Sequence, residues 1–160
     1  MILVTVGQVH GFQRLVDWMD EIAAHGGEEV VMQVGDTPRL PRHARSLVSA
    51  PHEEMLGLVR QSRLVVAHAG AGTVLTALQE RRPVVLVPRL RSLGEHIDDH
   101  QLELAEALAA QGKAIVAHSL DELRTALAGE PKLAPPGEVS PLVGALRRRI
   151  AEIAAARARA

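Results

Sequence analysis

Short apolar runs, each followed by a longer segment of mixed character, recur between residues 2 and 116 of the chain. Five of these runs are continuous rather than alternating and are rich in valine and isoleucine: Ile2–Val6, Val30–Val34, Leu64–Ala67, Val84–Val87 and Ala114–Val116. Continuous runs of this length are typical of strands that are covered on both faces, as in a parallel sheet. A weaker run, Leu47–Ala50, is a sixth candidate strand.

The segments between these runs carry apolar residues at helical spacing. In the first segment they lie three or four positions apart: Phe12, Leu15, Val16, Met19 and Ile22. Shorter stripes begin at Met55 and Leu102, and Ser119 with Glu122 is spaced as a capping box. Strand and helix therefore alternate, which predicts an α/β fold: a single Rossmann-like, doubly wound parallel sheet of about six strands with helices on both faces.

The C-terminal part of the chain reads differently. Residues 129–141 hold four of the nine prolines and are interpreted as a connector to a C-terminal helix over residues 141–157. The arginines of that helix are expected either to dock a partner or to cap the sheet. We find no internal repeat, so residues 1–160 are expected to form a single domain.

Composition narrows the function classes. The chain carries 18 Lys+Arg against 19 Asp+Glu, for a net charge of −1, and its only aromatic residues are Phe12 and Trp18. This balance argues against a nucleic-acid binder that neutralises phosphates or stacks bases. With no cysteine, disulfides and thiolate metal sites are excluded. The start of the chain lacks the features of a signal peptide, and no apolar run is long enough to span a membrane.

A ligand of an open parallel sheet is expected where the strand order reverses. With the common order 3-2-1-4-5-6, that crevice lies between the carboxyl ends of the first and fourth strands. The loop Gly7–Gly11 follows the first strand and His68–Thr73 follows the fourth, and both are rich in small residues. The second loop opens a helix, whose free N–H groups and positive end favour an anion.

Common nucleotide fingerprints fail at this loop. The third glycine of a dinucleotide-binding motif would fall on Leu75, and Gly72 is followed directly by Thr73 instead of the lysine of a Walker A motif. The failed dinucleotide motif disfavours an NAD-dependent enzyme. The loop is therefore interpreted either as a phosphate seat of another kind or as a tight turn that serves packing.

A second polar segment, Gly94–Gln101, follows the fifth strand and opens on the same edge of the sheet. Its dense carboxylates, imidazoles and amide suit a ligand with many hydroxyl groups. An alternative is a metal set of His96, His100 and Asp99. The arginines Arg89 and Arg91 are candidates for steering an anion, or for a solvated rim. The remaining histidines are interpreted as ordinary surface or loop residues: His10, His25, His43, His52 and His118.

Together, the segments Val65–Thr73, Pro83–Arg89 and Gly94–Gln101 resemble the C-terminal half of family-28-type GT-B glycosyltransferases. The combination of H-A-G-A-G-T with G-E-H-I-D-D-H-Q carries the likeness, which extends from Ile2 to about Leu123. The chain is most similar to the small subunits of two-subunit bacterial exopolysaccharide and capsule glycosyltransferases. It is more distantly similar to the catalytic subunit of the eukaryotic two-subunit GlcNAc transferase of the dolichol pathway.

The resemblance implies the following site residues. The donor diphosphate is held by His68 and the backbone amides of Gly70, Ala71, Gly72 and Thr73; the sugar hydroxyls are contacted by His100 and Gln101; and Glu95, His96 and Asp99 shape the same pocket. Thr76 stands where relatives often carry a Glu that holds the ribose, which weakens that contact. In the first-strand loop, Gln8 follows Gly7 where relatives often carry Thr, so no diphosphate role is assigned to Gln8.

The resemblance also implies an activity. The chain would bind a UDP-sugar and transfer its hexosyl unit to a lipid-linked saccharide, with no metal or other cofactor, and with no nucleic acid as partner. A membrane-associated second subunit would bind the acceptor, supply the general base and recruit this cytoplasmic chain to the inner face of the membrane. A non-catalytic nucleotide-sugar-binding or regulatory subunit is the main alternative, and a sugar-nucleotide epimerase a second one that the short chain disfavours.

Overall fold

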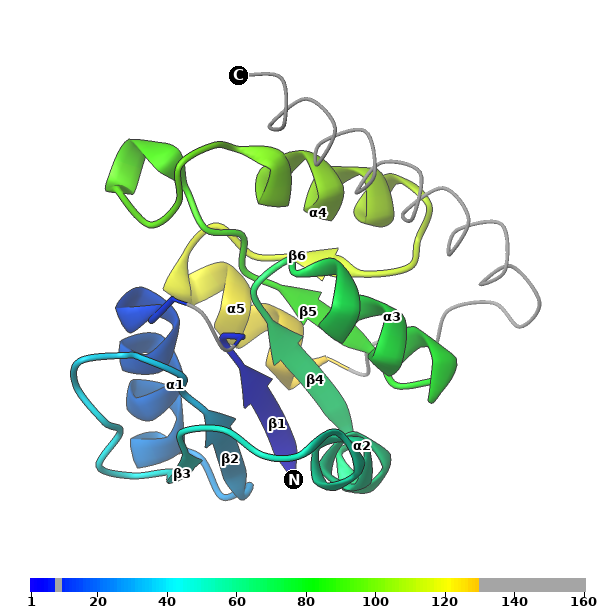
Figure 1. The fold of residues 1–160 in the computed structure, drawn as a ribbon. Helices are drawn as coiled ribbons and strands as arrows, with labels where there is room; N and C mark the ends of the chain where they lie inside the picture. The colour runs from blue at the N-terminus through cyan, green and yellow to red at the C-terminus, as the bar shows by residue number, and fades with distance from the viewer. Residues whose placement is uncertain (8–9, 130–160) are drawn as a thin grey trace.

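The computed structural model describes residues 1–7 and 10–129 (Figure 1). Its strands are β1 (Ile2–Thr5), β2 (Val30–Gln33), β3 (Arg45–Leu47), β4 (Leu64–Ala67), β5 (Val84–Leu86) and β6 (Ile115–Val116). Its helices are α1 (Gln13–His25), α2 (His52–Gln61), α3 (Ala71–Gln79), the 3-10 turn η1 (Arg91–Leu93), α4 (His100–Ala110) and α5 (Leu120–Ala128). Residues 130–160 lie outside the described part of the chain, so the expected connector over 129–141, from position 130 onward, and the expected helix over 141–157 are not described. Gln8 also lies outside the described residues.

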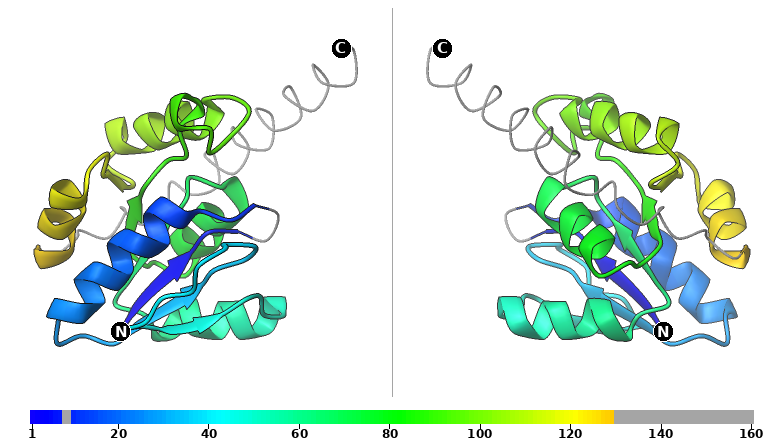
Figure 2. Two further views of the ribbon diagram at one scale, coloured as in Figure 1. Left: turned by 90° about the vertical axis from the view of Figure 1, so that its left-hand side faces the viewer. Right: turned by 90° about the vertical axis from the view of Figure 1, so that its right-hand side faces the viewer.

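All six strands form one parallel sheet in the order β3-β2-β1-β4-β5-β6. Ile2 of β1 pairs with Val30 of β2 on one side and with Leu64 of β4 on the other. The predicted strand order is therefore confirmed, and β1 and β4 lie at the point where it reverses. Figures 1 and 2 show the N-terminus at the opposite end of the sheet from α4, so the loops after β1, β4 and β5 share the other, carboxyl edge.

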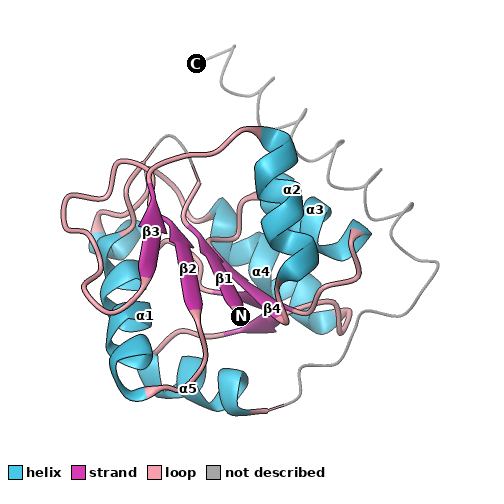
Figure 3. Cartoon of the chain, turned by 90° about the horizontal axis from the view of Figure 1, so that it is seen from below, coloured by secondary structure: helices cyan, strands magenta, loops and turns pink. Residues whose placement is uncertain are grey.

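Both faces of the sheet are buried, which explains the continuous apolar runs. Val4 faces one core cluster with residues of α1 and α5, and its neighbour Leu3 faces the other with residues of α2, α3 and α4. Figure 3 shows the same division of the helices across the sheet. Because side chains alternate along a strand, each strand must be apolar at every position when both faces are covered. Burying one such side chain stabilises the fold by about 1.5–3 kcal/mol.

The edge strand β3 differs from the predicted run. It spans Arg45–Leu47, with Leu47 opposite Gln33 of β2, whereas the sequence predicted a strand over Leu47–Ala50. Val48, which is 58% exposed, follows the strand and uses its carbonyl to accept a hydrogen bond from the backbone N–H of Gly35. An edge strand has only one paired neighbour, so a polar residue such as Arg45 is tolerated there and the apolar run does not mark its bounds.

Helix α5 begins at a side-chain cap. The hydroxyl of Ser119 accepts a hydrogen bond of 3.2 Å from the backbone N–H of Glu122, as the capping pattern predicts. The Glu122 carboxylate accepts from the N–H of His118 rather than from that of Ser119. Among the described residues, no helix combines the length and apolar character that a membrane crossing requires.

Candidate functional site

A cavity of about 500 Å³ opens at the carboxyl ends of β1, β2 and β4. We call it the switch-point cavity; its lining is Thr5, Gly7, Gln33, Ala50, His52, Met55, Leu56, Val59, His68, Gly70, Ala71, Gly72, Thr73 and Thr76. The structure therefore brings together every residue that the sequence assigned to the diphosphate and ribose, and Gly7 of the first-strand loop. The cavity lies where a doubly wound sheet places its ligand.

The start of α3 forms one wall of this cavity. Gly70 is its N-cap residue, and no side chain caps the helix. The first N–H groups of a helix have no partner within the helix, so those of Ala71, Gly72 and Thr73 are available to an anion. A Cβ on Gly72 would meet nothing within 4 Å, so packing does not explain that glycine. The open space beside Gly72 instead leaves room for a ligand to approach the amides of α3.

His68 lies beneath this loop and is buried. Its Nδ1 is 3.3 Å from the carbonyl oxygen of Thr5, which can only accept, so Nδ1 carries the proton and Nε2 does not. Burial, with the nearby Arg89 charge, lowers the pKa of His68 to about 4. The side chain is neutral near pH 7. The positive field of the cavity therefore comes from the amides of α3 rather than from an imidazolium.

A buried amide, Gln33, fixes the opposite side of the cavity. Its Oε1 accepts from the hydroxyl of Thr5 at 2.7 Å, and its Nε2 donates to the carbonyls of Gly7 and Val48, both at 3.0 Å. These bonds hold Gly7, whose φ of +81° favours glycine. Sequence reasoning missed Gln33, although a polar residue inside the apolar run Val30–Val34 was a signal.

Thr76 offers less than a free hydroxyl. Its Oγ1 donates to the carbonyl of Gly72 at 3.0 Å, so its hydrogen is already engaged and only its lone pairs face a ligand.

His52, at the start of α2, also lines the cavity. His52 is exposed, as the sequence interpretation of a surface histidine expected, and the weak α2 stripe gave no sign that it also borders this cavity.

The predicted sugar-binding run lies at the same edge of the sheet, but none of its described residues lines the switch-point cavity. The two carboxylate oxygens of Glu95 accept hydrogen bonds of 2.7 and 2.8 Å from the guanidinium of Arg14. Asp99 accepts from the backbone N–H of Arg91 at 3.1 Å, and the buried Gln101 accepts from that of Arg89 at 3.3 Å. Three of the five predicted sugar contacts are thus engaged in shaping their own loop.

His96 and His100 gather around Asp98 instead of Asp99. The Nδ1 of His96 is 3.1 Å from Oδ1 of Asp98, and the Nδ1 of His100 contacts the same oxygen. The alternative metal set of the sequence analysis therefore named the wrong carboxylate. In the turn that leads into α4, the side chains at the alternate positions 96, 98 and 100 lie on the same side of the backbone, and the side chain at position 99 lies on another.

Arg89 is not free to steer an anion, contrary to one of the two sequence-based interpretations. Only 3% of the side chain is exposed, and its guanidinium donates to the carbonyls of Val6 and His10 at 2.7 and 2.5 Å. The same group lies 5.2 Å from the ring centroid of Phe12. Arg89 therefore ties the loop after β5 to the loop after β1. Arg91 is exposed.

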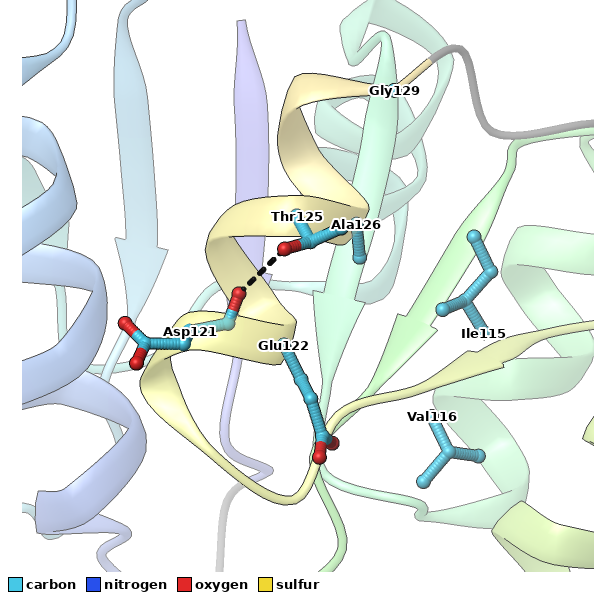
Figure 4. Close-up of a pocket in the computed structure, with 7 residues that line it drawn as sticks. All are labelled: Ile115, Val116, Asp121, Glu122, Thr125, Ala126 and Gly129. Carbon is cyan, nitrogen blue, oxygen red and sulfur yellow. Dashed lines mark hydrogen bonds between the residues drawn. The ribbon is translucent and has the colours of Figure 1, made fainter.

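A second cavity, of about 550 Å³, lies between β6 and α5 (Figure 4). It is lined by Ile115, Val116, Asp121, Glu122, Thr125, Ala126 and Gly129, none of which the sequence placed in a site. Thr125 donates to the carbonyl of Asp121, as the dashed line in Figure 4 shows, and Glu122 caps its own helix. These polar groups serve α5 itself, so we assign no ligand here.

Comparison with known proteins adds an independent line of observation. Residues 1–127 match the family model described as the glycosyltransferase family 28 C-terminal domain. The UDP-N-acetylglucosamine transferase subunit ALG13 of Cryptococcus neoformans is 47% identical over 68 residues, which is 42% of this chain and 32% of that protein. Its counterpart in Yarrowia lipolytica is 26% identical over 140 residues, covering 77% of this chain and 67% of that protein.

Solved structures agree on the fold. The glycotransferase of kitacinnamycin superposes with a TM-score of 0.61 at 22% identity, over 91% of this chain and 38% of that one. The solution structure of ALG13 gives a TM-score of 0.59 at 16% identity, over 88% of this chain and 91% of that one. The chain shares its fold with glycosyltransferases of GT-B type. It spans about a third, 32%, of the length of the Cryptococcus relative. Since the family model covers residues 1–127, the chain belongs to the glycosyltransferase family 28 C-terminal domain family.

Proposed function

We propose that this chain binds a UDP-linked sugar and acts as the donor-binding subunit of a hexosyltransferase. One observation carries the proposal: the uncapped, glycine-lined start of α3 forms a wall of the switch-point cavity. An amide wall of this kind fits a diphosphate better than it fits a neutral ligand, because N–H groups and the helix dipole both favour negative charge. The family membership and the names of the relatives point to the same donor class.

The same amides supply a chemical role. When a glycosyl bond to a diphosphate breaks, negative charge grows on the departing phosphate oxygens. Pre-oriented donors that meet this charge lower the barrier, and removing one such donor typically costs about 2.7–4 kcal/mol of transition-state stabilisation. The amides of Ala71, Gly72 and Thr73 would perform this task with no metal or cofactor. Thr73 adds a side-chain hydroxyl beside them.

The acceptor side of the reaction is proposed to come from another polypeptide. The ALG13 relatives are named as subunits of a transferase, which favours a two-component enzyme. The general base that deprotonates the acceptor hydroxyl would then belong to a membrane-associated partner that presents a lipid-linked saccharide. This partner would bring the chain to the inner face of the membrane, as expected for exopolysaccharide synthesis.

Calorimetry with UDP tests the donor assignment. The discriminating variant is Gly72→Ala, because the added Cβ meets no protein atom within 4 Å and so changes the cavity rather than the packing. We expect at least a tenfold loss of UDP affinity, with no loss of thermal stability in the absence of ligand. The matched control is Gly27→Ala, where the added Cβ also meets nothing within 4 Å and lies outside the cavity lining. Equal UDP affinity for all three proteins would overturn the proposal.

A non-catalytic nucleotide-sugar-binding or regulatory subunit is the second candidate. It is favoured by Thr76, which stands at the position where relatives often hold the ribose with a carboxylate. The hydroxyl of Thr76 already donates its hydrogen to the carbonyl of Gly72. Both candidates bind UDP, so affinity does not separate them. Sugar transfer by the chain reconstituted with its acceptor-binding subunit does: turnover supports the transferase, and its absence despite UDP binding supports the regulatory subunit.

A further inference from the structure

Two imidazoles and one carboxylate converge on the loop between η1 and α4. The Nδ1 atoms of His96 and His100 both approach the same oxygen of Asp98, and the two rings lie edge to face with centroids 4.6 Å apart. One ligand atom from each of the three residues lies within 4.8 Å of the others. We call these residues the His96–Asp98–His100 cluster. The side chains are partly buried, with 13% of His96, 38% of Asp98 and 33% of His100 exposed.

The loop that carries the cluster is anchored on both sides. Before it, Gly94 adopts a φ of +68°, and Glu95 is fixed by its two bonds from Arg14. Within it, the carboxylate of Asp99 accepts from the backbone N–H of Arg91, which closes the turn. These bonds fix the backbone of the loop that carries the three candidate ligands, so less conformational entropy is lost when an ion binds.

A third imidazole approaches from a different segment. His10, in the loop after β1, lies with its ring centroid 6.5 Å from that of His96, at 85° between the ring planes. Its carbonyl is held by Arg89, so the approach is fixed by the fold rather than by the loop of the cluster. His10, from the loop after β1, thus lies next to the cluster through His96, a gathering that the diphosphate site of the proposed function does not require.

We propose that His96, Asp98 and His100 bind a divalent transition-metal ion of the zinc class, with a water molecule or His10 completing the coordination. Ligands of a tetrahedral zinc at about 2.0–2.1 Å are roughly 3.3 Å apart. The 3.1 Å between His96 and Asp98 already matches that separation, and a 4.8 Å span closes by side-chain rotation. Imidazole with carboxylate selects Zn²⁺, Co²⁺ or Ni²⁺ over Mg²⁺ and Ca²⁺, which prefer oxygen-only sets.

The cluster shares no residue with the switch-point cavity, although His96 and His100 are also residues that the resemblance assigns to the sugar pocket. A metal here would brace the loop before α4 rather than bridge to the diphosphate. The ion would tie residues 96–100 together and, through His10, tie this loop to the one after β1. The expected consequence is a rise in thermal stability on addition of Zn²⁺ that Mg²⁺ does not reproduce.

Cobalt titration of the full chain, without an affinity tag and stripped with chelator, tests the proposal. The visible absorption of Co²⁺ in a tetrahedral site reports coordination directly, and calorimetry with Zn²⁺ gives the stoichiometry. We expect one ion per chain, and at least a tenfold loss of affinity in each of His96→Ala, His100→Ala and the shape-conserving Asp98→Asn. The matched controls are His25→Ala and His43→Ala, which remove histidines outside the cluster and should leave cobalt binding unchanged.

Two outcomes would overturn the metal site. The first is that the wild-type chain binds Co²⁺ and Zn²⁺ no more tightly than the Asp98→Asn variant does. The second is that His25→Ala and His43→Ala lose as much metal affinity as the variants of the cluster. UDP calorimetry on the chelator-stripped chain is run in parallel. Retained UDP binding with no metal site rejects this inference alone, and lost UDP binding with an intact metal site rejects the proposed donor function alone.

Discussion

The guanidinium of Arg14 donates to both carboxylate oxygens of Glu95, at 2.7 and 2.8 Å, across 81 positions of the sequence. Both side chains are largely buried, with 16% and 14% exposed. The Glu95 carboxylate also accepts from the backbone N–H of Leu90 at 3.0 Å. This pair fastens the loop after β5 to α1, so both carboxylate oxygens of Glu95 are engaged within the fold.

Replacing Glu95 by Gln should therefore destabilise the fold. The change leaves the buried Arg14 without its charge partner, and breaking a buried pair in this way costs about 3–5 kcal/mol at the upper limit. We expect a loss of about 2 kcal/mol in the free energy of unfolding by urea, since both side chains retain some exposure. The matched control is Arg39→Ala, which removes a pair whose partners are 72% and 49% exposed and should change stability by less than about 1 kcal/mol. Equal effects of the two variants would contradict this role of Glu95.

Alanine substitutions at Gly70, just before α3, and at Gly72, within α3, should have opposite effects on stability. A Cβ on Gly70 would approach Cε1 of His68 to 2.8 Å, whereas one on Gly72 would meet nothing within 4 Å. We expect Gly70→Ala to lose about 1–3 kcal/mol through overpacking. Gly72→Ala should be neutral or stabilising by up to about 1 kcal/mol because alanine favours the helix. Urea unfolding of both variants checks the contrast, and a large loss in Gly72→Ala would show that packing explains both glycines.

The pKa of His68 makes a prediction about acid stability. With the folded-state pKa lowered to about 4 by burial, only the unfolded chain gains this proton as the pH falls below about 6.5. Stability is therefore lost on acidification from about pH 6.5 towards 4, by roughly 2 kcal/mol at about pH 5. Unfolding of His68→Gln at neutral and acid pH should show a smaller pH-dependent loss than wild type, with His25→Gln as control. The same slope in both variants would mean that His68 is not the group responsible.

Arg89 should be needed for the position of the loop after β1. One terminal nitrogen of the Arg89 guanidinium donates to the carbonyls of both Val6 and His10, while the planar group lies over the Phe12 ring. A lysine ammonium ends about one bond short of that nitrogen and has no planar face for Phe12. We expect Arg89→Lys to lose about 2–4 kcal/mol of stability, since a poorly paired cation would remain buried. UDP affinity should fall with it, because Gly7 lies in the same loop. The exposed neighbour Arg91→Lys should change neither quantity, and unchanged UDP binding in a folded Arg89→Lys protein would contradict the link.

The sequence predicted the architecture because burial on both faces of a parallel sheet leaves a direct trace. The apolar runs at Ile2, Val30, Leu64, Val84 and Ala114 revealed the strands, and the common strand order of doubly wound folds then predicted the reversal between β1 and β4, which the structure confirms. The edge strand β3 left no such trace, because one unpaired side admits Arg45. Its start was therefore predicted two residues too late and its end three residues too late.

The site was predictable in part for a related reason. The loop from His68 to Thr73 joins neighbouring positions of one segment, so its local pattern was sufficient. Gln33 and His52 reach the same cavity from other elements, and only the packing of those elements reveals it. The partner of His96 and His100 depended on the turn into α4, which distinguishes Asp98 from Asp99. Such details depend on side-chain direction, which sequence spacing alone does not specify.

The central claim is that the first amides of α3 hold the diphosphate of a nucleotide-sugar. Amide chemical shifts of the isotope-labelled chain, followed during titration with UDP and separately with uridine, test it most directly. We predict that the amide signals of Ala71, Gly72 and Thr73 move with UDP and not with uridine, which lacks the phosphates. Shifts confined to the second cavity between Ile115 and Gly129, or none in residues 71–73 at saturating UDP, would contradict the claim.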